Sequence, residues 1–539
     1  MLALLGPALL SGVLYVLAFP PYGVAPLAFV ALVPWLVQIL RTPHRRGRLL
    51  GSWVFCITIS LLGFHWVAYV LKQFAGLPWI LAGVGLLGFS TFGQLQVVGF
   101  ALTTPRLAKL LRSSPHPALT LLWLALGALT YTACDFLLPK LFRDTLGHSW
   151  ANFVDLRLNA RWAGAYGLTF VTSFCNLALA WAIVLWRDRD EPSAWPALRR
   201  GFPGLLASAI LLLILFGYGA STREWIEKEY AQAKRKIPIA VIQANIGDIE
   251  KISAESGLRD ARKKVLKTFF ELSDQALARA PKTQAIIWPE TSYPATFRTP
   301  DLADDLELDQ QVENYSKSRK VGLFFGGYDQ NRNLRKDYNA FFFLSPEAKD
   351  LQIYRKNRLL LFGEEMPFAQ TFPQLRRWFP QVGNFGRGDG PTSMVLPTDP
   401  PTRAAPAICY EVLFSNDMIA AKKSGAEWIL NITNDSWFGP YAEPELHLAL
   451  STFRSIELGI PMVRSTNTGI TAWVDPTGKI REPTRTFEPA VLPIELPIVP
   501  LPPSWVERLG DLFGALSLAL ATIGHAWGHV WSTRRLSKL

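Results

Sequence analysis

Charged residues are scarce in this chain. They make up 18% of its 539 residues, whereas hydrophobic residues make up 50%. Typical soluble domains carry about 25% charged residues. The mean hydropathy is also positive, at +0.17. This composition favours a protein with a large membrane-embedded part over an entirely soluble one.

Cysteine is scarce as well. The four cysteines show no CxxC spacing and have no histidine partner at zinc-finger distance, so both a disulfide framework and a structural metal site are disfavoured. Cys56, Cys134 and Cys175 lie in or beside apolar stretches, where a cysteine most simply packs as a small apolar side chain.

Acidic residues are outnumbered by basic ones, which gives a formal net charge of +12. Such a charge suits either nucleic acid or an anionic lipid surface. No Lys/Arg-rich recognition helix is present, and the arginines cluster beside apolar stretches. We therefore expect a lipid surface and no nucleic-acid partner.

Long apolar stretches dominate the first part of the chain. Each is about 17–25 residues long, enough to cross a bilayer as a helix. We predict membrane spans at 2–18, 24–40, 50–71, 77–101, 117–138, 163–186, 203–220 and 507–530. The predicted organisation is a seven-helix membrane domain (1–220), a connector (221–236), a polar domain (237–495), a Pro-rich connector (496–506), an eighth helix (507–531) and a tail (532–539).

The orientation follows from the short loops. Lys and Arg gather after the second, fourth and sixth spans, as at Arg45, Arg106 and Arg187, and again in the tail. Loop five, which is longer, is an exception. Because basic loops stay in the cytoplasm, we predict that the polar domain lies on the opposite, extracytoplasmic side.

The polar domain alternates strand-like and helix-like runs. The amphipathic stretch Ala254–Ala280 lies between the first two of eight short runs that are rich in apolar residues. These runs are Ile237–Ile246, Ala285–Trp288, Val321–Gly326, Asn339–Leu344, Ala405–Tyr410, Trp428–Ile432, Pro461–Ser465 and Ile470–Val474. This pattern predicts an α/β domain with buried strands.

Cys409 is the only cysteine of the polar domain and ends one of these apolar runs. Strand ends are where α/β sheets present reactive groups, so Cys409 is a candidate nucleophile. A nucleophilic cysteine needs a base, and His447 is the only histidine of the domain. Alternatively, a buried glutamate takes the thiol proton while a lysine stabilises the negative charge.

Glu290, in Trp288-Pro289-Glu290, and Lys356 each lie beside an apolar run, as Cys409 does. The order Glu, Lys, Cys resembles the triad of the carbon–nitrogen hydrolase (nitrilase) superfamily. This resemblance implies an αββα sandwich fold for the polar domain.

A narrower resemblance covers the whole chain. The segments Y-R-K-N-R-L-L-L-F-G-E-E-M-P-F (354–368), I-C-Y-E (408–411), N-D-S-W-F-G (434–439) and R-S-T-N-T-G (464–469), together with an F-P-P-Y-G turn after the first span, are similar to the apolipoprotein N-acyltransferase family. The resemblance implies that Glu290, Lys356 and Cys409 are catalytic. It assigns supporting or substrate-binding roles to Glu364, Tyr410 and Glu411.

The implied reaction is a ping-pong acyl transfer in the bacterial inner membrane. A phospholipid would donate the acyl chain through a thioester on Cys409, and the acceptor would be the N-terminal amine of a diacylglyceryl-cysteine lipoprotein. No metal or organic cofactor is implied, and we expect a monomer. One position departs from the family pattern, because Ile252 stands where the family often has a functional tryptophan.

Two other functions compete with this interpretation. A membrane-anchored amidase acting on small amides would use the same triad, but it gives no reason for eight spans. A transporter with an extracytoplasmic binding domain would explain the spans but not the Glu-Lys-Cys order. The spans also lack the paired charges that a transport path needs.

Overall fold

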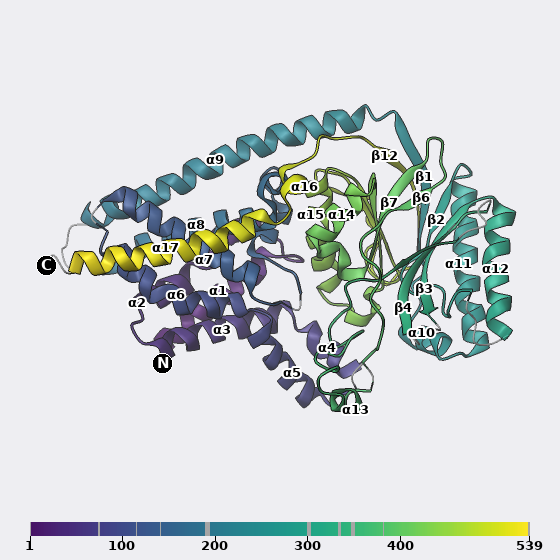
Figure 1. The fold of residues 1–539 in the computed structure, drawn as a ribbon, viewed down its shortest axis with the longest axis horizontal. Helices are drawn as coiled ribbons and strands as arrows, with labels where there is room; N and C mark the ends of the chain where they lie inside the picture. The colour runs from purple at the N-terminus through teal and green to yellow at the C-terminus, as the bar shows by residue number, and fades with distance from the viewer. Residues whose placement is uncertain are drawn as a thin grey trace. The chain divides into compact units, whose positions relative to one another are not determined.

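The computed structural model describes residues 2–73, 76–114, 116–140, 142–188, 195–298, 303–331, 336–346, 351–380 and 382–536. These residues form two compact units. The first comprises Met1–Ala68, Leu77–Glu224 and Ser504–Leu539, and the second comprises Tyr69–Gly76 and Trp225–Pro503. Helices make up the first unit, and both β-sheets belong to the second (Figure 1).

The helical unit follows the apolar stretches of the sequence. Its α-helices are α1 (Leu2–Ala18), α2 (Val33–Arg41), α3 (Arg45–Gly63), α4 (Trp66–Gln73, which continues into the second unit), α5 (Trp79–Phe92), α6 (Leu95–Arg112), α7 (Pro117–Leu137), α8 (Ala160–Arg187), α9 (Trp195–Ala231, which also continues into the second unit), α16 (Trp505–Leu509) and α17 (Leu512–Leu536). Short 3-10 helices η1 (Ala25–Phe29), η2 (Leu146–Asn152) and η3 (Leu156–Asn159) lie between them.

Every predicted span is at least partly helical, but the count of eight membrane-spanning helices is not confirmed. Among the described residues, three helical segments are long and apolar enough to cross a bilayer: Pro117–Leu137, Leu156–Arg187 and Arg199–Ala231. Two bent pairs raise the number to five if each pair is one span. The bends are 66° between α3 and α4 and 45° between α5 and α6.

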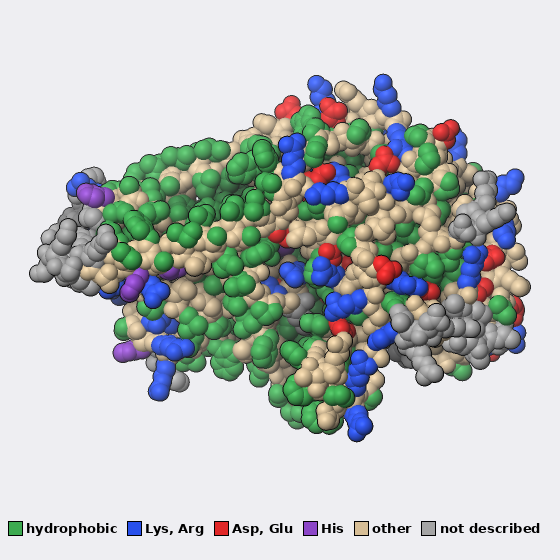
Figure 2. Space-filling model, viewed as in Figure 1, with side chains coloured by type: hydrophobic (Ala, Val, Ile, Leu, Met, Phe, Trp, Pro, Cys, Tyr) green, Lys and Arg blue, Asp and Glu red, His purple; other side chains and the backbone are tan. Residues whose placement is uncertain are grey.

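The surface of the helical unit is apolar. Figure 2 shows hydrophobic side chains over α9 and α17, whereas Lys, Arg, Asp and Glu gather over the unit that contains the sheets. On α9, Leu213 and Ile214 expose 70% and 62% of their surface. An exposed apolar face of this length is what a membrane-spanning helix presents to lipid.

The second unit contains two six-stranded sheets. One has the order β12-β1-β2-β3-β4-β5, and the other has the order β11-β10-β9-β8-β7-β6. The strands are β1 (Arg235–Gln243), β2 (Ala285–Ile287), β3 (Gly322–Asn331), β4 (Lys336–Leu344), β5 (Gln352–Arg355), β6 (Met394–Leu396), β7 (Thr402–Ile408), β8 (Trp428–Thr433), β9 (Met462–Thr466), β10 (Ala472–Val474), β11 (Ile480–Arg481) and β12 (Ala490–Ile498).

Helices cover the outer face of each sheet. The first sheet is covered by α11 (Arg259–Arg279) and α12 (Ala303–Arg319), and the second by α14 (Ser415–Lys423) and α15 (Glu443–Leu458) (Figure 1). Two shorter helices, α10 (Asp248–Glu255) and α13 (Gln374–Trp378), complete the unit. The predicted α/β fold with a layered helix–sheet–sheet–helix arrangement is confirmed.

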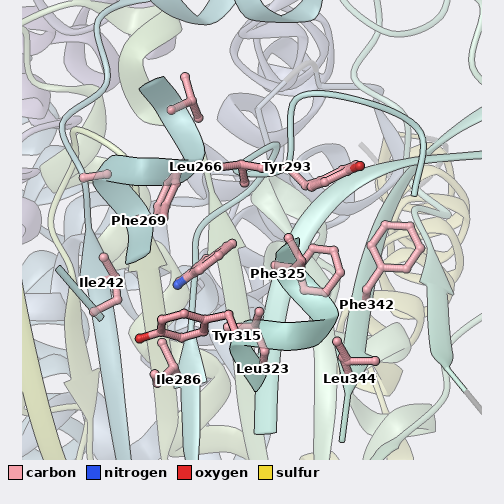
Figure 3. Close-up of a cluster of buried hydrophobic side chains, with 14 of the residues drawn as sticks. Ile242, Leu266, Phe269, Ile286, Tyr293, Tyr315, Leu323, Phe325, Phe342 and Leu344 are labelled. Atoms are coloured by element: carbon pink, nitrogen blue, oxygen red, sulfur yellow. The ribbon is translucent and has the colours of Figure 1, made fainter. Parts of the chain in front are cut away.

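A large apolar core fixes the strand that leads to the candidate site. Phe269 of α11 stacks on Trp288 with ring centroids 4.9 Å apart. The indole N–H of Trp288 donates to the Ser273 hydroxyl at 2.9 Å. Figure 3 shows Phe269 among the labelled side chains of this core, with Ile286 of β2 nearby. This packing anchors the chain just before Glu290.

The eight runs predicted as strands, Ile237–Ile246 to Ile470–Val474, all contain strands, but β5, β6, β11 and β12 were not predicted. The strand β12 contains Pro493 and Pro497 and runs to Ile498, beyond the predicted domain end at 495. Because β12 is an edge strand, it needs backbone donors on only one side and therefore tolerates proline. The predicted connector at 221–236 is helical as far as Ala231.

Candidate active site

The residues predicted to form the triad all follow strand ends. Glu290 comes shortly after β2, Lys356 directly follows β5, and Cys409 directly follows β7. They expose only 6%, 2% and 8% of their surface. A carboxyl group, an ammonium group and a thiol are therefore withdrawn from bulk water. Charge interactions are stronger in such a buried site than in water.

Lys356 lies between two carboxylates. Its Nζ donates to Glu364 Oε1 at 2.9 Å and to Glu290 Oε1 at 3.4 Å. Burial alone would lower the pKa of Lys356, but Glu364 and then Glu290 outweigh this effect and hold the pKa well above its usual value. Lys356 is therefore a fixed ammonium in the centre of the site.

The carboxylate of Glu290 is held on both oxygens. Oε1 accepts from Asn339 Nδ2 at 2.7 Å, and Oε2 accepts from the backbone N–H of Asn434 at 2.9 Å. The same Asn339 amide donates to Glu364 Oε1 at 2.8 Å. Asn339 thus bridges the two carboxylates that flank Lys356 and fixes the orientation of Glu290.

Cys409 begins the 3-10 helix η4 (Cys409–Leu413) and has a φ of 56°, in the left-handed region that non-glycine residues rarely adopt. Burial raises the pKa of the Cys409 thiol well above its usual value, and Glu290 raises it further, whereas Lys356 lowers it. The resting thiol is therefore protonated, so nucleophilic attack requires a base that takes this proton.

Tyr410 and Glu411 connect the nucleophile segment to the lysine segment. Glu411 accepts hydrogen bonds from the backbone N–H groups of Asn357 and Arg358, at 2.6 and 2.9 Å. The Tyr410 hydroxyl donates to the carbonyl of Leu359 at 2.6 Å. Burial raises the pKa of Glu411 to about 7. These contacts join the segment that begins at Cys409 to the segment that follows Lys356.

His447 lies in a buried polar cluster with Asp435, Glu443 and Arg464. Its Nδ1 is 3.0 Å from the Arg464 guanidinium, and burial together with Arg464 lowers the pKa of His447 to about 4. A neutral imidazole whose Nδ1 accepts from an arginine is a poor candidate for the base. Asp435, Glu443 and His447 have ligand atoms within 4.8 Å of one another, as in a metal site, but Arg464 already supplies a cation there.

Comparisons with known proteins decide the family. The family "Apolipoprotein N-acyltransferase N-terminal domain" matches residues 11–178, and the family "Carbon-nitrogen hydrolase" matches residues 238–497. An apolipoprotein N-acyltransferase of Bdellovibrio bacteriovorus is 31% identical over 495 residues, which cover 89% of this chain and 86% of the relative. The chain belongs to the apolipoprotein N-acyltransferase family.

Further relatives extend over nearly the whole chain. An apolipoprotein N-acyltransferase of Geobacter metallireducens is 28% identical over 525 residues, covering 96% of this chain and 93% of the relative. Among solved structures, a carbon-nitrogen hydrolase of Helicobacter pylori aligns with 14% identity and a TM-score of 0.36, covering 48% of this chain and 88% of that chain.

Asn339 and Asn434 are site residues that the sequence analysis did not single out. Asn339 lies in the run Tyr-Asn-Ala-Phe-Phe-Phe of β4, where it is 4% exposed. A polar residue within such an apolar strand is a sequence signal that indicates a candidate site residue. Asn434 begins the N-D-S-W-F-G segment, but its contact with Glu290 is made by its backbone, which the residue type does not reveal.

Ile252 and Glu365 belong to sequence segments that adjoin the site residues. Ile252, which stands at the position of the family tryptophan, lies in α10, but its side chain is outside the part of the chain that the structure describes. Glu365, next to Glu364, pairs with Arg387. It is less buried than Glu364, with 29% of its side chain exposed against 14%. Only Glu364 of these two adjacent acids contacts Lys356.

Proposed function

We propose that this protein transfers an acyl chain from a membrane phospholipid to the N-terminal α-amine of a diacylglyceryl-cysteine lipoprotein. A thioester on Cys409 carries the acyl chain between the two substrates. The observation that carries the proposal is Lys356, a buried ammonium bonded to Glu290 and Glu364 in a chain of this family. The triad Glu290, Lys356 and Cys409 is part of the proposal.

In the first half-reaction, the Glu290 carboxylate takes the proton of the Cys409 thiol as sulfur attacks an ester carbonyl of the phospholipid. The tetrahedral oxyanion is stabilised by Lys356, with the backbone N–H of Tyr410 as a second donor. When the intermediate collapses, the lysophospholipid oxygen leaves and takes the proton from Glu290. An acyl-Cys409 thioester and an ionised Glu290 remain.

In the second half-reaction, the lipoprotein amine attacks the thioester carbonyl, and Glu290 accepts a proton from the amine. Collapse of this second tetrahedral intermediate breaks the C–S bond and forms the amide. The Cys409 thiolate then recovers the proton from Glu290. The fixed charge of Lys356 serves both steps, because both pass through an oxyanion at the same carbonyl carbon.

Glu364 supports Lys356 in this scheme. It holds the ammonium with its Oε1, and its Oε2 accepts from the backbone N–H of Leu360 at 2.8 Å. Close to Glu364 in the sequence, Phe362 and Phe368 expose 61% and 75% of their surface. Exposed aromatic side chains beside a buried charged site suit an acyl chain better than a small polar amide.

The same proposal includes location. The basic loops support a polar domain that lies outside the cytoplasm of a bacterium and is anchored in the inner membrane by apolar helices. A phospholipid donor and a lipid-modified acceptor both reside in that membrane. Water near the thioester would hydrolyse it, so a buried Cys409 is an advantage for transfer over hydrolysis.

The test is transfer to an acceptor. Purified full-length protein is incubated with phosphatidylethanolamine vesicles and a synthetic diacylglyceryl-cysteine peptide, and the peptide mass is measured. A gain of one acyl group, lost with an N-acetylated peptide and with Cys409→Ala, is expected. An unchanged peptide, together with release of ammonia when a small primary amide is supplied instead of the vesicles, would support the amidase interpretation.

A further inference from the structure

A buried amide spans the backbone on both sides of the Cys409 turn. Asn431 of β8 is fully buried, and its Nδ2 donates to the carbonyl of Ala407 at 3.1 Å and to the carbonyl of Cys409 at 3.0 Å. Asn431 pairs with Ala407 in the register of the parallel strands β7 and β8. One side chain therefore links the last part of β7 to the start of η4.

The orientation of that amide is fixed by Arg464. The Asn431 Oδ1 accepts from Arg464 NH1 at 2.7 Å, so the nitrogen of the amide faces Cys409. Arg464 is itself fully buried, in the adjacent strand β9, where it pairs with Asn431. A second guanidinium nitrogen donates to Asp435 Oδ2 at 3.0 Å.

The surroundings leave little room for this network to move. The Asp435 carboxylate also accepts from the Thr433 hydroxyl at 2.9 Å. A side chain at Gly469 would place its Cβ 2.1 Å from Asp435 Oδ2, so only glycine fits there. The network therefore reaches Cys409 through its backbone carbonyl, which accepts from the Asn431 amide.

We propose that Asn431, oriented by Arg464, is a positioning residue that holds the Cys409 backbone in its left-handed conformation. That conformation is strained for a residue with a side chain, so it persists only where neighbouring contacts enforce it. The hydrogen bond from Asn431 to the Cys409 carbonyl is such a contact. Without it, Cys409 relaxes towards an extended backbone, and its sulfur moves away from Glu290 and Lys356.

This inference rests on the proposed role of Cys409 and deepens it. A purely structural role for Asn431 would affect stability and activity together. A positioning role affects the chemical step while leaving donor binding unchanged, because Asn431 is fully buried and its amide donates to backbone carbonyls. The distinction requires kcat and KM for the phospholipid donor together with the thermal unfolding midpoint of each protein.

The experiment compares Asn431→Leu, which removes the donor, with Asn431→Asp, which keeps an acceptor for Arg464 but places an oxygen against the two carbonyls. The matched control is Thr402→Val. Thr402 is fully buried at the far end of β7 and bonds to Glu427 at 2.7 Å. All are measured in full-length protein with phosphatidylethanolamine vesicles and the diacylglyceryl peptide.

Both Asn431 variants are expected to lower kcat at least tenfold with an unchanged KM for the donor. Thr402→Val is expected to lower the unfolding midpoint but to keep kcat within twofold. If Asn431→Leu fails to fold, Asn431→Asp carries the test, since its carboxylate pairs with Arg464. The inference would be overturned if a folded Asn431 variant kept the wild-type kcat. It would also be overturned if kcat fell only in proportion to the fall in the thermal unfolding midpoint. Absence of acyl transfer in the wild type would instead refute the proposed function.

Discussion

The ammonium of Lys356 lies closer to Glu364, at 2.9 Å, than to any other carboxylate in the described part of the chain. Its contact with Glu290 is longer, at 3.4 Å. This difference has a chemical consequence. In the proposed mechanism Glu290 accepts the proton of Cys409, and a lysine held mainly by Glu364 is paired less closely with this carboxylate. We propose that Glu364 separates the ammonium from Glu290, which serves as the base.

Replacing Glu364 tests this separation. In Glu364→Gln the strongest charge partner of Lys356 is lost, so Glu290 alone pairs with the ammonium and the proposed oxyanion donor loses its main anchor. We expect kcat/KM to fall by about 10- to 100-fold, which corresponds to about 1.4–2.7 kcal/mol. The control is Glu365→Gln, at the adjacent acid that pairs with Arg387, and it should stay within twofold of wild type.

The same variant should change the pH dependence. Glu364 and Glu290 raise the pKa of Lys356 against the effect of burial, and Cys409 and Tyr410 also face its ammonium. Without Glu364 the pKa of Lys356 falls, so the ammonium is lost at lower pH. The alkaline limb of the kcat/KM profile should therefore shift towards lower pH. An unshifted limb would show that Lys356 does not titrate there.

Asn339 should matter for activity more than for stability. Asn339→Leu removes the 2.7 Å hydrogen bond to Glu290 and the 2.8 Å hydrogen bond to Glu364, so the two carboxylates lose their common donor. The Asn339 Oδ1 is buried without a hydrogen-bond partner among the described residues, so its removal offsets part of the stability cost. We expect kcat/KM to fall by about 10-fold or more, which is about 1.4 kcal/mol.

The measurements for Asn339→Leu are steady-state acyl transfer and the thermal unfolding midpoint. Asn339→Asp serves as a second arm, because it adds a third carboxylate beside Glu290 and Glu364. Its loss of activity should exceed that of Asn339→Leu. Equal activity of Asn339→Leu and wild type would show that the Asn339 side chain has no role in catalysis.

His447 predicts a pH dependence of stability. Burial and Arg464 lower its pKa to about 4, whereas an unperturbed histidine titrates near pH 6.5. Between these values the unfolded chain binds a proton that the folded chain does not. The stability that comes from neutral His447 is therefore complete above about pH 6.5 and is lost as the pH falls towards 4, by an amount on the order of 3 kcal/mol.

Comparison with His447→Asn isolates this contribution, because Asp435, Glu443 and Arg464 remain in both proteins. Burial raises the pKa of Glu443 well above its usual value, whereas Arg464 and His447 bring that of Asp435 to about 2 although burial alone would raise it. The stability advantage of wild type over His447→Asn should shrink from pH 7 to pH 4. A constant difference in unfolding midpoint would contradict the buried neutral state.

The strand ends could be predicted from the sequence because each is marked locally. The predicted runs Ala285–Trp288 and Ala405–Tyr410 are apolar, and the charged Glu290 or the reactive Cys409 lies at or just after the end of the run. Asn339 could not be placed in the same way. It reaches Glu290 and Glu364 because β4 pairs with β5, and that pairing brings it beside Lys356.

Other differences from the prediction have similar long-range causes. The predicted span 50–71 is broken between Gly63 and Trp66, and hydropathy alone does not show a bend of 66°. His447 is a plausible base in the sequence, but its Nδ1 is engaged by Arg464 from β9. The strand β12 was not predicted, because Pro493 and Pro497 disfavour an interior strand but not an edge, and only its last residues fall in the predicted connector 496–506.

The central claim, an acyl thioester on Cys409, is tested most directly by intact-protein mass spectrometry. Wild type and Cys409→Ala are incubated with phospholipid vesicles, with no lipoprotein acceptor, after the thiol is shown to be free and the protein folded. The account predicts a fatty-acyl mass increment on wild type alone, released by hydroxylamine and by a diacylglyceryl-cysteine peptide. No increment on wild type, or an equal increment on Cys409→Ala, would contradict it.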